Sequence, residues 1–202
     1  MEPVIHRTWH QDKKQALGLL NDLLQRLWAQ GRARDQLKEV LCCETGGRFR
    51  LVEASQMHIC GEPIWQQDLP TAKSTMELRQ NLRELQGVLG LSDDELFELE
   101  LAVGEVCGNV VKHARAGRSK IYSFPDKVIV EISDDGPGIQ PENLRASVLM
   151  PGFSTIDSLG MGFTLILTLV DKVWLATSAG GTRVILSKSL KQGLAEVLLK
   201  DS

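Results

Sequence analysis

Residues 101–114 read LAVGEVCGNVVKHA, and this stretch decides the fold of the chain. In the longer segment 93–114, apolar side chains recur every three or four residues, as on the buried face of an α-helix: Leu96, Leu99, Val103, Val106 and Val110. Glu105, Asn109 and His113 are spaced four apart and line up beside that face. A carboxylate next to an amide oxygen could hold a proton acceptor beside a hydrated Mg²⁺, which prefers oxygen ligands. The alternative interpretation is that these three residues form a solvated polar edge of the helix.

Two capping motifs predict where this helix and the one before it begin. The pattern S-x-x-E occurs at 92–95 and again at 74–77. In a capping box, the serine hydroxyl and the glutamate carboxylate each accept a backbone N–H of the first helical turn. The two motifs therefore predict helices over 93–114 and 75–89.

The stretch ISDDGPGI at 132–139 follows a predicted strand over 128–133. Gly136 and Gly138 would let the backbone come close to a flat ligand. Asp134, at the strand end, could accept a hydrogen bond from an exocyclic amine. Adenine offers such an amine, whereas guanine offers an oxygen acceptor, so Asp134 would select adenine. A plain turn is the alternative.

A third motif, SLGMGF at 158–163, opens a predicted helix over 161–171. Free N–H groups at a helix start attract phosphate. By itself the motif is weak, because no third glycine follows and no strand precedes it, and the chain has no G-x-x-x-x-G-K-[ST] loop. Strands are predicted at 172–178 and 182–188, and the Gly-, Ser- and Pro-rich stretch 150–160 is predicted to be a loop.

Taken in order, LAVGEVCGNVVKHA, ISDDGPGI, SLGMGF and GGTRVIL resemble the N, G1 and G2 boxes and the terminal threonine strand of the GHKL ATPases. That superfamily includes gyrase, the heat-shock chaperone, histidine kinases and mismatch-repair ATPases. The resemblance covers roughly residues 64–188. DDGPGI followed by PGFSTIDSLGMGF most resembles the anti-sigma-factor serine/threonine kinases and the switch kinases of bacterial stress signalling. The likeness to histidine kinases is weaker, because no histidine stands in an H-E-x-x-x-P phosphoacceptor context.

The resemblance implies an α/β (α+β) two-layer sandwich, in which helices cover one face of a mostly antiparallel mixed sheet. We expect this GHKL ATP-binding kinase domain over residues 47–202. Before it, the apolar periodicity of residues 9–45 predicts a helical hairpin, assigned to 1–46. The hairpin would pack on the core of the chain, or would form a regulatory, partner or homodimer surface. Residues 48–54 and 57–60 are expected to be extended.

The resemblance also implies ATP and Mg²⁺ as cofactors and gives roles to individual residues. Glu105 would be the general base, and Asn109 would ligate Mg²⁺. Asp134 would bind the adenine amine with support from Thr182. The other residues that the resemblance places around the nucleotide are Lys112, His113, Gly136, Gly138, Ser154, Thr155, Gly160, Met161 and Gly162.

The function that this resemblance implies is transfer of the ATP γ-phosphate to a Ser or Thr of a regulatory partner, usually an anti-anti-sigma (STAS) protein. One alternative is a non-catalytic module that sequesters a sigma factor or another regulator, with ATP as a structural ligand. Another is a histidine-kinase-like ATPase domain. A further alternative keeps catalysis but has water as the phosphoryl acceptor. The Glu105–Asn109 pair favours an enzyme but does not separate a protein acceptor from water.

The composition and charge of the chain argue against several other classes of protein. With 202 residues, 43% hydrophobic and 24% charged, the chain is typical of a globular domain and not of a disordered or fibrous one. A net charge of −3 lacks the basic surplus of a nucleic-acid binder. No apolar run reaches the ~18 residues of a membrane span, and the first residues lack the core of a signal peptide. We therefore expect a cytoplasmic protein that binds neither nucleic acid nor membrane, with its four cysteines reduced and mainly buried.

Overall fold

The computed structural model describes residues 31–69, 72–149 and 162–191. The elements in chain order are α2 (Arg32–Glu44), β1 (Phe49–Leu51), a 3₁₀ turn (Ala54–Gln56), β2 (Trp65–Asp68), α3 (Ala72–Glu84), α4 (Gln86–Leu89), α5 (Asp93–His113), β3 (Gly117–Ser123), β4 (Lys127–Asp134), α6 (Pro141–Leu149), α7 (Gly162–Leu169), β5 (Lys172–Ser178) and β6 (Gly181–Ser189). The expected loop over 150–160 and the first half of the expected hairpin lie outside these residues.

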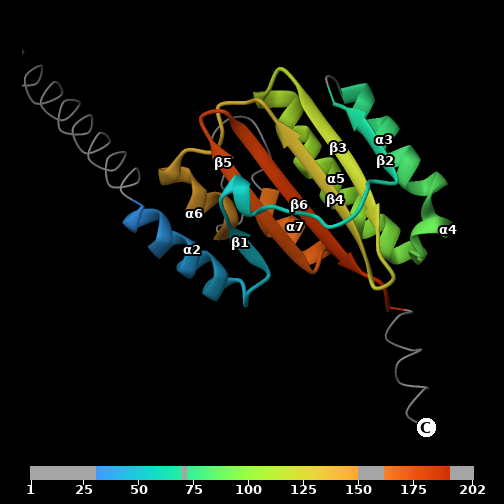
Figure 1. The fold of residues 1–202 in the computed structure, drawn as a ribbon, viewed down its shortest axis with the longest axis horizontal. Coiled ribbons are helices and arrows are strands. Elements are labelled where there is room, and N and C mark those ends of the chain that lie inside the picture. The colour runs from blue at the N-terminus through green and yellow to red at the C-terminus, as the bar shows by residue number, and fades with distance from the viewer. Residues whose placement is uncertain (1–30, 70–71, 150–161, 192–202) are drawn as a thin grey trace, which may run out of the picture.

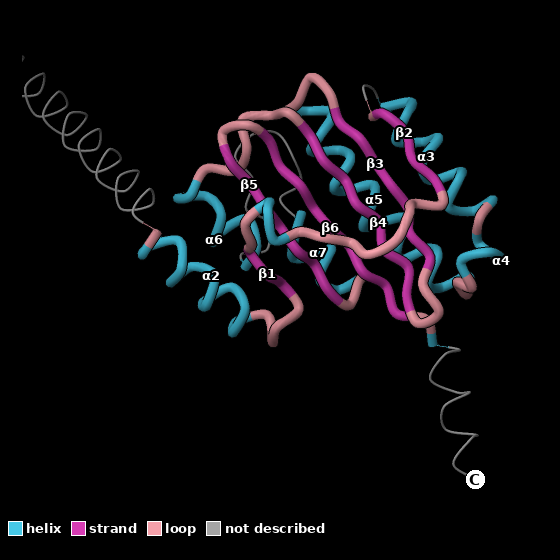
Figure 2. The backbone as a smooth tube through the Cα atoms, viewed as in Figure 1, coloured by secondary structure: helices cyan, strands magenta, loops and turns pink. Residues whose placement is uncertain are grey.

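The six strands form one mixed sheet in the order β1-β5-β6-β4-β3-β2. Among the described strands, only β1 and β5 pair in parallel, so the expectation of a mostly antiparallel mixed sheet is confirmed. Helices α3, α5 and α7 lie together behind the sheet in Figure 1, which confirms the two-layer architecture. The segment between β1 and β2 crosses the other face of the sheet, which we call the outer face (Figure 2).

The main core lies between the helix layer and the sheet. All five residues of the apolar stripe predicted for α5 are buried in it. Each such Leu or Val contributes about 1.5–3 kcal/mol by leaving water. Leu41 of α2 is also fully buried in this core, so α2 packs across the boundary that we placed between residues 46 and 47. That division into domains stays a prediction.

One of the two capping motifs is a cap and the other is not. Ser92 Oγ accepts the backbone N–H of Glu95 at 3.3 Å, and the Glu95 carboxylate accepts the backbone N–H of Ser92 at 2.9 Å. The prediction for Ser74 was wrong, because α3 begins at Ala72 and Ser74 is a buried residue of its first turn. Glu77 instead accepts a hydrogen bond from Gln67 of β2 at 2.6 Å. The four-residue pattern also occurs along a helix face, so it does not by itself locate a helix start.

The outer face of the sheet explains another wrong prediction. Residues 57–60 are not a strand. Met57 and Ile59 pack on the outer face, while His58 and Cys60 are exposed. Packed and exposed side chains therefore alternate because the segment lies on the sheet, and not because it pairs with a strand. Arg183 fastens this segment by donating to the Met57 carbonyl at 2.9 Å and to the buried Glu131 at 2.9 Å.

Two further features of the described residues bear on the expectations. Only Cys107 is buried, whereas Cys43 and Cys60 are exposed, so the cysteines do not act mainly as buried apolar residues. None of the helices in the described ranges has the length and apolarity that a membrane span requires.

Candidate functional site

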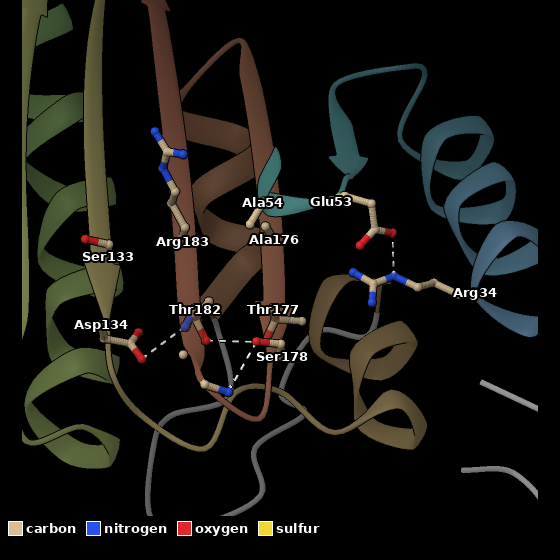
Figure 3. Close-up of a pocket in the computed structure, with 12 residues that line it drawn as sticks. Arg34, Glu53, Ala54, Ser133, Asp134, Ala176, Thr177, Ser178, Thr182 and Arg183 are labelled. Carbon is tan, nitrogen blue, oxygen red and sulfur yellow. Dashed lines mark hydrogen bonds and ion pairs between the residues drawn. The ribbon is translucent and has the colours of Figure 1, made fainter. Parts of the chain in front are cut away.

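Asp134 ends β4, two residues beyond Ile132 of the main core, and its side chain therefore starts on the helix side of the sheet. Its Oδ1 accepts the backbone N–H of Gly136 at 2.8 Å and that of Thr182 at 3.2 Å, the second of which is drawn in Figure 3. Among the described residues, no hydrogen bond reaches Oδ2. The carboxylate is thus held in one orientation, with one oxygen left as an acceptor.

The surroundings of Asp134 act on its charge in opposite directions. Burial raises the pKa of its carboxyl group, and the negative charge of Asp135 raises the pKa further. The N–H groups of Gly136 and Thr182 and the nearby charge of His113 oppose this shift, but burial dominates. A partly desolvated carboxylate with a free oxygen gains from any ligand that brings an N–H donor to it.

Asp135 has a structural role that differs from that of its neighbour. Its Oδ1 accepts the backbone N–H groups of Arg115 at 3.0 Å and Ala116 at 2.8 Å, and the Ala116 hydrogen bond is the main cause that holds the pKa of this carboxyl below its usual value. These bonds join the loop after β4 to the chain that leaves α5. The loop therefore places Asp134 beside the C-terminal end of α5, where Asn109 and His113 lie.

The glycines of the loop are required by the packing of the chain itself. Gly138 has φ of 72°, and a Cβ atom there would lie 2.1 Å from the carbonyl oxygen of Ser178. At Gly136, a Cβ atom would lie 2.9 Å from Asp134 Oδ1 and 3.1 Å from the His113 carbonyl. Their close neighbours are thus the β5–β6 hairpin and the end of α5. Contact between these glycines and a nucleotide stays a prediction.

Thr177 is a site residue that sequence reasoning missed. Its Oγ1 accepts the backbone N–H of Ile139 at 2.8 Å and lies 3.3 Å from the hydroxyl of Thr182 (Figure 3). Thr177 and Thr182 are paired residues of the β5–β6 hairpin. The pair fixes the loop after Gly138 to the same threonine whose N–H orients Asp134. The only sequence signal was a threonine on each side of the Gly180-Gly181 turn.

Helix α5 supplies the other polar groups. Glu105 is half-buried, and Asn109, Lys112 and His113 are exposed on the last turns of the helix. Gly162 is the first residue of α7, which packs against α5, and no atom of the described residues lies within 4 Å of the position of its missing Cβ atom. Four other residues assigned to the site lie outside the described part of the chain: Ser154, Thr155, Gly160 and Met161.

A cavity of about 260 Å³ reaches Asp134 and Thr182 from the outer face of the sheet, where Ser133 and Arg183 line it (Figure 3). Arg34 and Glu53 close its far side, 3.1 Å apart. Ligand pockets usually enclose about 300–1,000 Å³. This cavity is smaller than that and lies on the wrong side of β4 for the groups of α5, so we do not place a nucleotide in it.

The groups on the helix side fit a magnesium nucleotide in kind. Asp134 Oδ2 is an oriented acceptor for an amine, and Asn109 carries an exposed amide oxygen of the type that Mg²⁺ accepts. Glu105, one helical turn from Asn109, adds a carboxylate, and α7 packs against the same helix. No group of three or more His, Cys, Asp or Glu residues gathers into a metal site within the described ranges.

Known proteins resemble the chain over this same region. The family described as histidine kinase-like ATPase domain matches residues 70–188, more than half of the chain. An anti-sigma F factor of Clostridium novyi is 30% identical over 105 residues, which are 48% of this chain and 73% of that protein. A serine-protein kinase RsbW of Halalkalibacterium halodurans is 31% identical over 100 residues, 46% of this chain and 62% of the kinase.

Solved structures show a weaker likeness. The structure of the RsbU and RsbW domains of Rv1364c from Mycobacterium tuberculosis aligns with a TM-score of 0.44 and 18% identity. The alignment covers 62% of this chain and 32% of the mycobacterial chain. The chain therefore spans less than two thirds of that protein and of the Halalkalibacterium kinase.

Proposed function

Because the chain belongs to the family of histidine kinase-like ATPase domains, we propose that it binds ATP with Mg²⁺ and phosphorylates a serine or threonine of a regulatory partner protein. The observation that carries this proposal is the Asp134 carboxylate beside the end of α5. Two N–H groups orient it, and its second oxygen accepts no hydrogen bond from the described part of the chain. The names of two relatives, an anti-sigma F factor and a serine-protein kinase, support a protein acceptor.

Each residue has a separate task in this proposal. Asp134 Oδ2 accepts a hydrogen bond from the N6 amine of adenine. Because this fixes one end of the nucleotide, it also sets the position of the phosphates. Asn109 holds Mg²⁺, which when bound supplies positive charge against the phosphate oxygens. Glu105 accepts the proton of the attacking hydroxyl. At the same time the hydroxyl oxygen bonds to the γ-phosphorus, and the bond from that phosphorus to ADP breaks. Phosphoryl transfer depends mainly on positioning and charge neutralisation, so a site with few protein groups is sufficient.

The partner in this proposal is a STAS-type anti-anti-sigma protein, with a sigma factor as a second bound protein. The name of the Clostridium relative also supports a second candidate function, in which the chain sequesters a sigma factor without transferring phosphate. The two functions differ in what happens to the γ-phosphate of ATP when the partner is present.

The test is incubation of the purified chain with γ-labelled ATP, Mg²⁺ and purified STAS-domain proteins from the same genome. We expect label on a serine or threonine of one of them. Release of free labelled phosphate without labelled protein would mean that water is the acceptor. A stable complex with a sigma factor and no transfer to any protein would favour sequestration.

A further inference from the structure

Three strands of the sheet each carry a large apolar side chain on the outer face. In each strand the two residues that flank it belong to the main core, so the residue between them points to the opposite side. The three residues are Ile129 of β4, Trp174 of β5 and Ile185 of β6. Trp174 and Ile185 are paired across β5 and β6, and Ile129 lies two residues from Glu131, the β4 partner of Ile185. The three side chains therefore form one continuous apolar floor.

Residues 56–61, in the segment between β1 and β2, form a roof over part of this floor (Figure 2). Met57 and Ile59 of the roof pack against the floor. Arg183 holds the start of the roof through its hydrogen bond to the Met57 carbonyl at 2.9 Å. At the other end, a Cβ atom on Gly61 would lie 3.8 Å from the ring of Phe124, so this ring lies against the end of the roof. The protein therefore holds the roof in place at both ends.

A cavity of about 320 Å³ lies between the floor and the roof. Its lining consists of the three floor residues, roof residues 56–60, Phe124 and Lys127. Ligand pockets of proteins usually enclose about 300–1,000 Å³, so this cavity is large enough for a small molecule. It shares no lining residue with the cavity that reaches Asp134, and it lies on the opposite face of the sheet from α5. The cavity is therefore separate from the proposed nucleotide site.

Lys127 gives this cavity a positive charge. None of the described residues that line it is an Asp or a Glu. The Lys127 ammonium lies 5.6 Å from the centre of the Phe124 ring and 3.5 Å from Asp126, whose side chain is 72% exposed. An ion pair in contact with solvent contributes little, so Lys127 can bind an anion in the cavity without losing a strong partner. Glu131, a buried carboxylate of the outer face, is bound by Arg183 at 2.9 Å.

We propose that this cavity is a second binding site, which takes a small carboxylate with a flat aromatic body. The rings of Trp174 and Phe124 favour an aromatic body, because rings gain from stacked or edge-to-face contact as well as from leaving water. Lys127 favours a carboxylate at one end of the ligand. A preformed cavity of this size encloses a free small molecule, whereas a docking protein needs a much wider surface. This site does not depend on the proposed function.

The first experiment compares three probes that share one ring system but differ in charge: naphthoate, naphthamide and naphthylmethylamine. Calorimetry with the full chain measures the affinity of each probe, with and without Mg·ATP. We expect naphthoate to bind about 3- to 5-fold more tightly than the amide, as for an ion pair in contact with solvent, and the amine to bind most weakly. Mg·ATP should leave all three affinities unchanged, because the proposed nucleotide site lies on the other face of the sheet.

The second experiment repeats these measurements with variants of the chain. Lys127→Gln is expected to remove the preference for the acid over the amide while keeping the affinity for the amide. Arg118→Gln is the matched control, because it removes the same charge from the outer face but outside the cavity, and it should keep the preference. Ile129→Trp fills the floor and should weaken all three probes about 10-fold or more. Urea unfolding shows whether each variant is folded, and Lys127→Gln tests the site even if Ile129→Trp does not fold.

Four outcomes would overturn the proposal. The first is that the wild type binds no naphthoate at millimolar concentration, and the second is that it binds the acid and the amide equally. The third is that Mg·ATP displaces naphthoate, because the ring would then lie in the nucleotide site. The fourth is that Lys127→Gln keeps the preference for the acid, or that Arg118→Gln loses it to the same extent, because Lys127 would then not hold the carboxylate.

Discussion

Thr182 donates its backbone N–H to Asp134 Oδ1 across 3.2 Å, joining the start of β6 to the end of β4. Thr182 also lies 3.3 Å, hydroxyl to hydroxyl, from Thr177, which holds the loop after Gly138. The orientation of the Asp134 carboxylate thus depends on three segments that are far apart in the sequence. Because Oδ1 is occupied twice, the direction in which Oδ2 can accept a ligand is fixed before any ligand arrives.

Asp134→Asn tests the assignment of Oδ2 to adenine. The amide oxygen of the asparagine would take the two N–H groups, so its NH₂ would face the adenine amine, donor against donor. Loss of the charged hydrogen bond is expected to weaken ATP binding by about 1.5–3 kcal/mol, roughly 10- to 150-fold. Calorimetry with ATP and GTP measures this, and the wild type should bind ATP but not GTP. Equal binding of the two nucleotides by the wild type would contradict the assignment.

The same carboxylate predicts a pH dependence of stability. Burial raises the pKa of Asp134 above its unfolded value of about 3.9. The contribution of such a group to stability is fully present below that unfolded pKa and is lost as the pH rises through the higher, folded pKa. Relative to Asp134→Asn, the nucleotide-free wild type should therefore become less stable as the pH rises from about 3.9 through that range. Urea midpoints of both proteins across this range measure the difference. A wild type that gains stability over the variant with rising pH would contradict it.

Leu41→Ala tests whether α2 is part of the core of the domain. Leu41 is fully buried in the main core, and removing it should cost about 2–5 kcal/mol of the free energy of unfolding. Val40→Ala, at the neighbouring exposed position, is the control and should cost little. Denaturant unfolding of the full chain measures both. If both variants unfold as the wild type does, α2 does not contribute to this core.

Local sequence signals predicted the fold where one residue pattern had one physical meaning. Ser92 and Glu95 form the predicted cap, and the five-residue stripe of α5 is buried as expected. The same pattern failed at Ser74, because α3 already begins at Ala72 and Ser74 lies inside it. Strand β3 was not predicted, because its first four residues, 117–120, are Gly-Arg-Ser-Lys and show no alternation of apolar and polar side chains. Its position is set by pairing with β4 rather than by its own sequence.

The site was predictable only in part. Asp134 stands out because it ends a strand before glycines, and the structure places it beside α5. Thr177 could not be found, because its role depends on the register of the β5–β6 hairpin. The roles of Glu105 and Asn109 stay predictions.

Asn109→Ala should separate metal binding from proton transfer. Asn109 is neutral and exposed, and its amide oxygen is the group proposed to hold Mg²⁺. Without it, we expect nucleotide affinity to lose its dependence on Mg²⁺, and phosphoryl transfer to fall with it. Calorimetry with and without Mg²⁺ measures the first effect. Full Mg²⁺-dependent binding by the variant would show that Asn109 belongs to a solvated helix edge.

The most direct test of the central claim is the rate of phosphoryl transfer by Glu105→Gln, measured with labelled ATP on the partner protein beside the affinity for Mg·ATP. The substitution keeps the shape and hydrogen bonding of the side chain but removes the base. We expect near-normal affinity for Mg·ATP and a rate that falls about 10²- to 10⁴-fold, the usual contribution of a general base. Transfer at the wild-type rate would contradict the claim that Glu105 accepts the proton of the attacking hydroxyl.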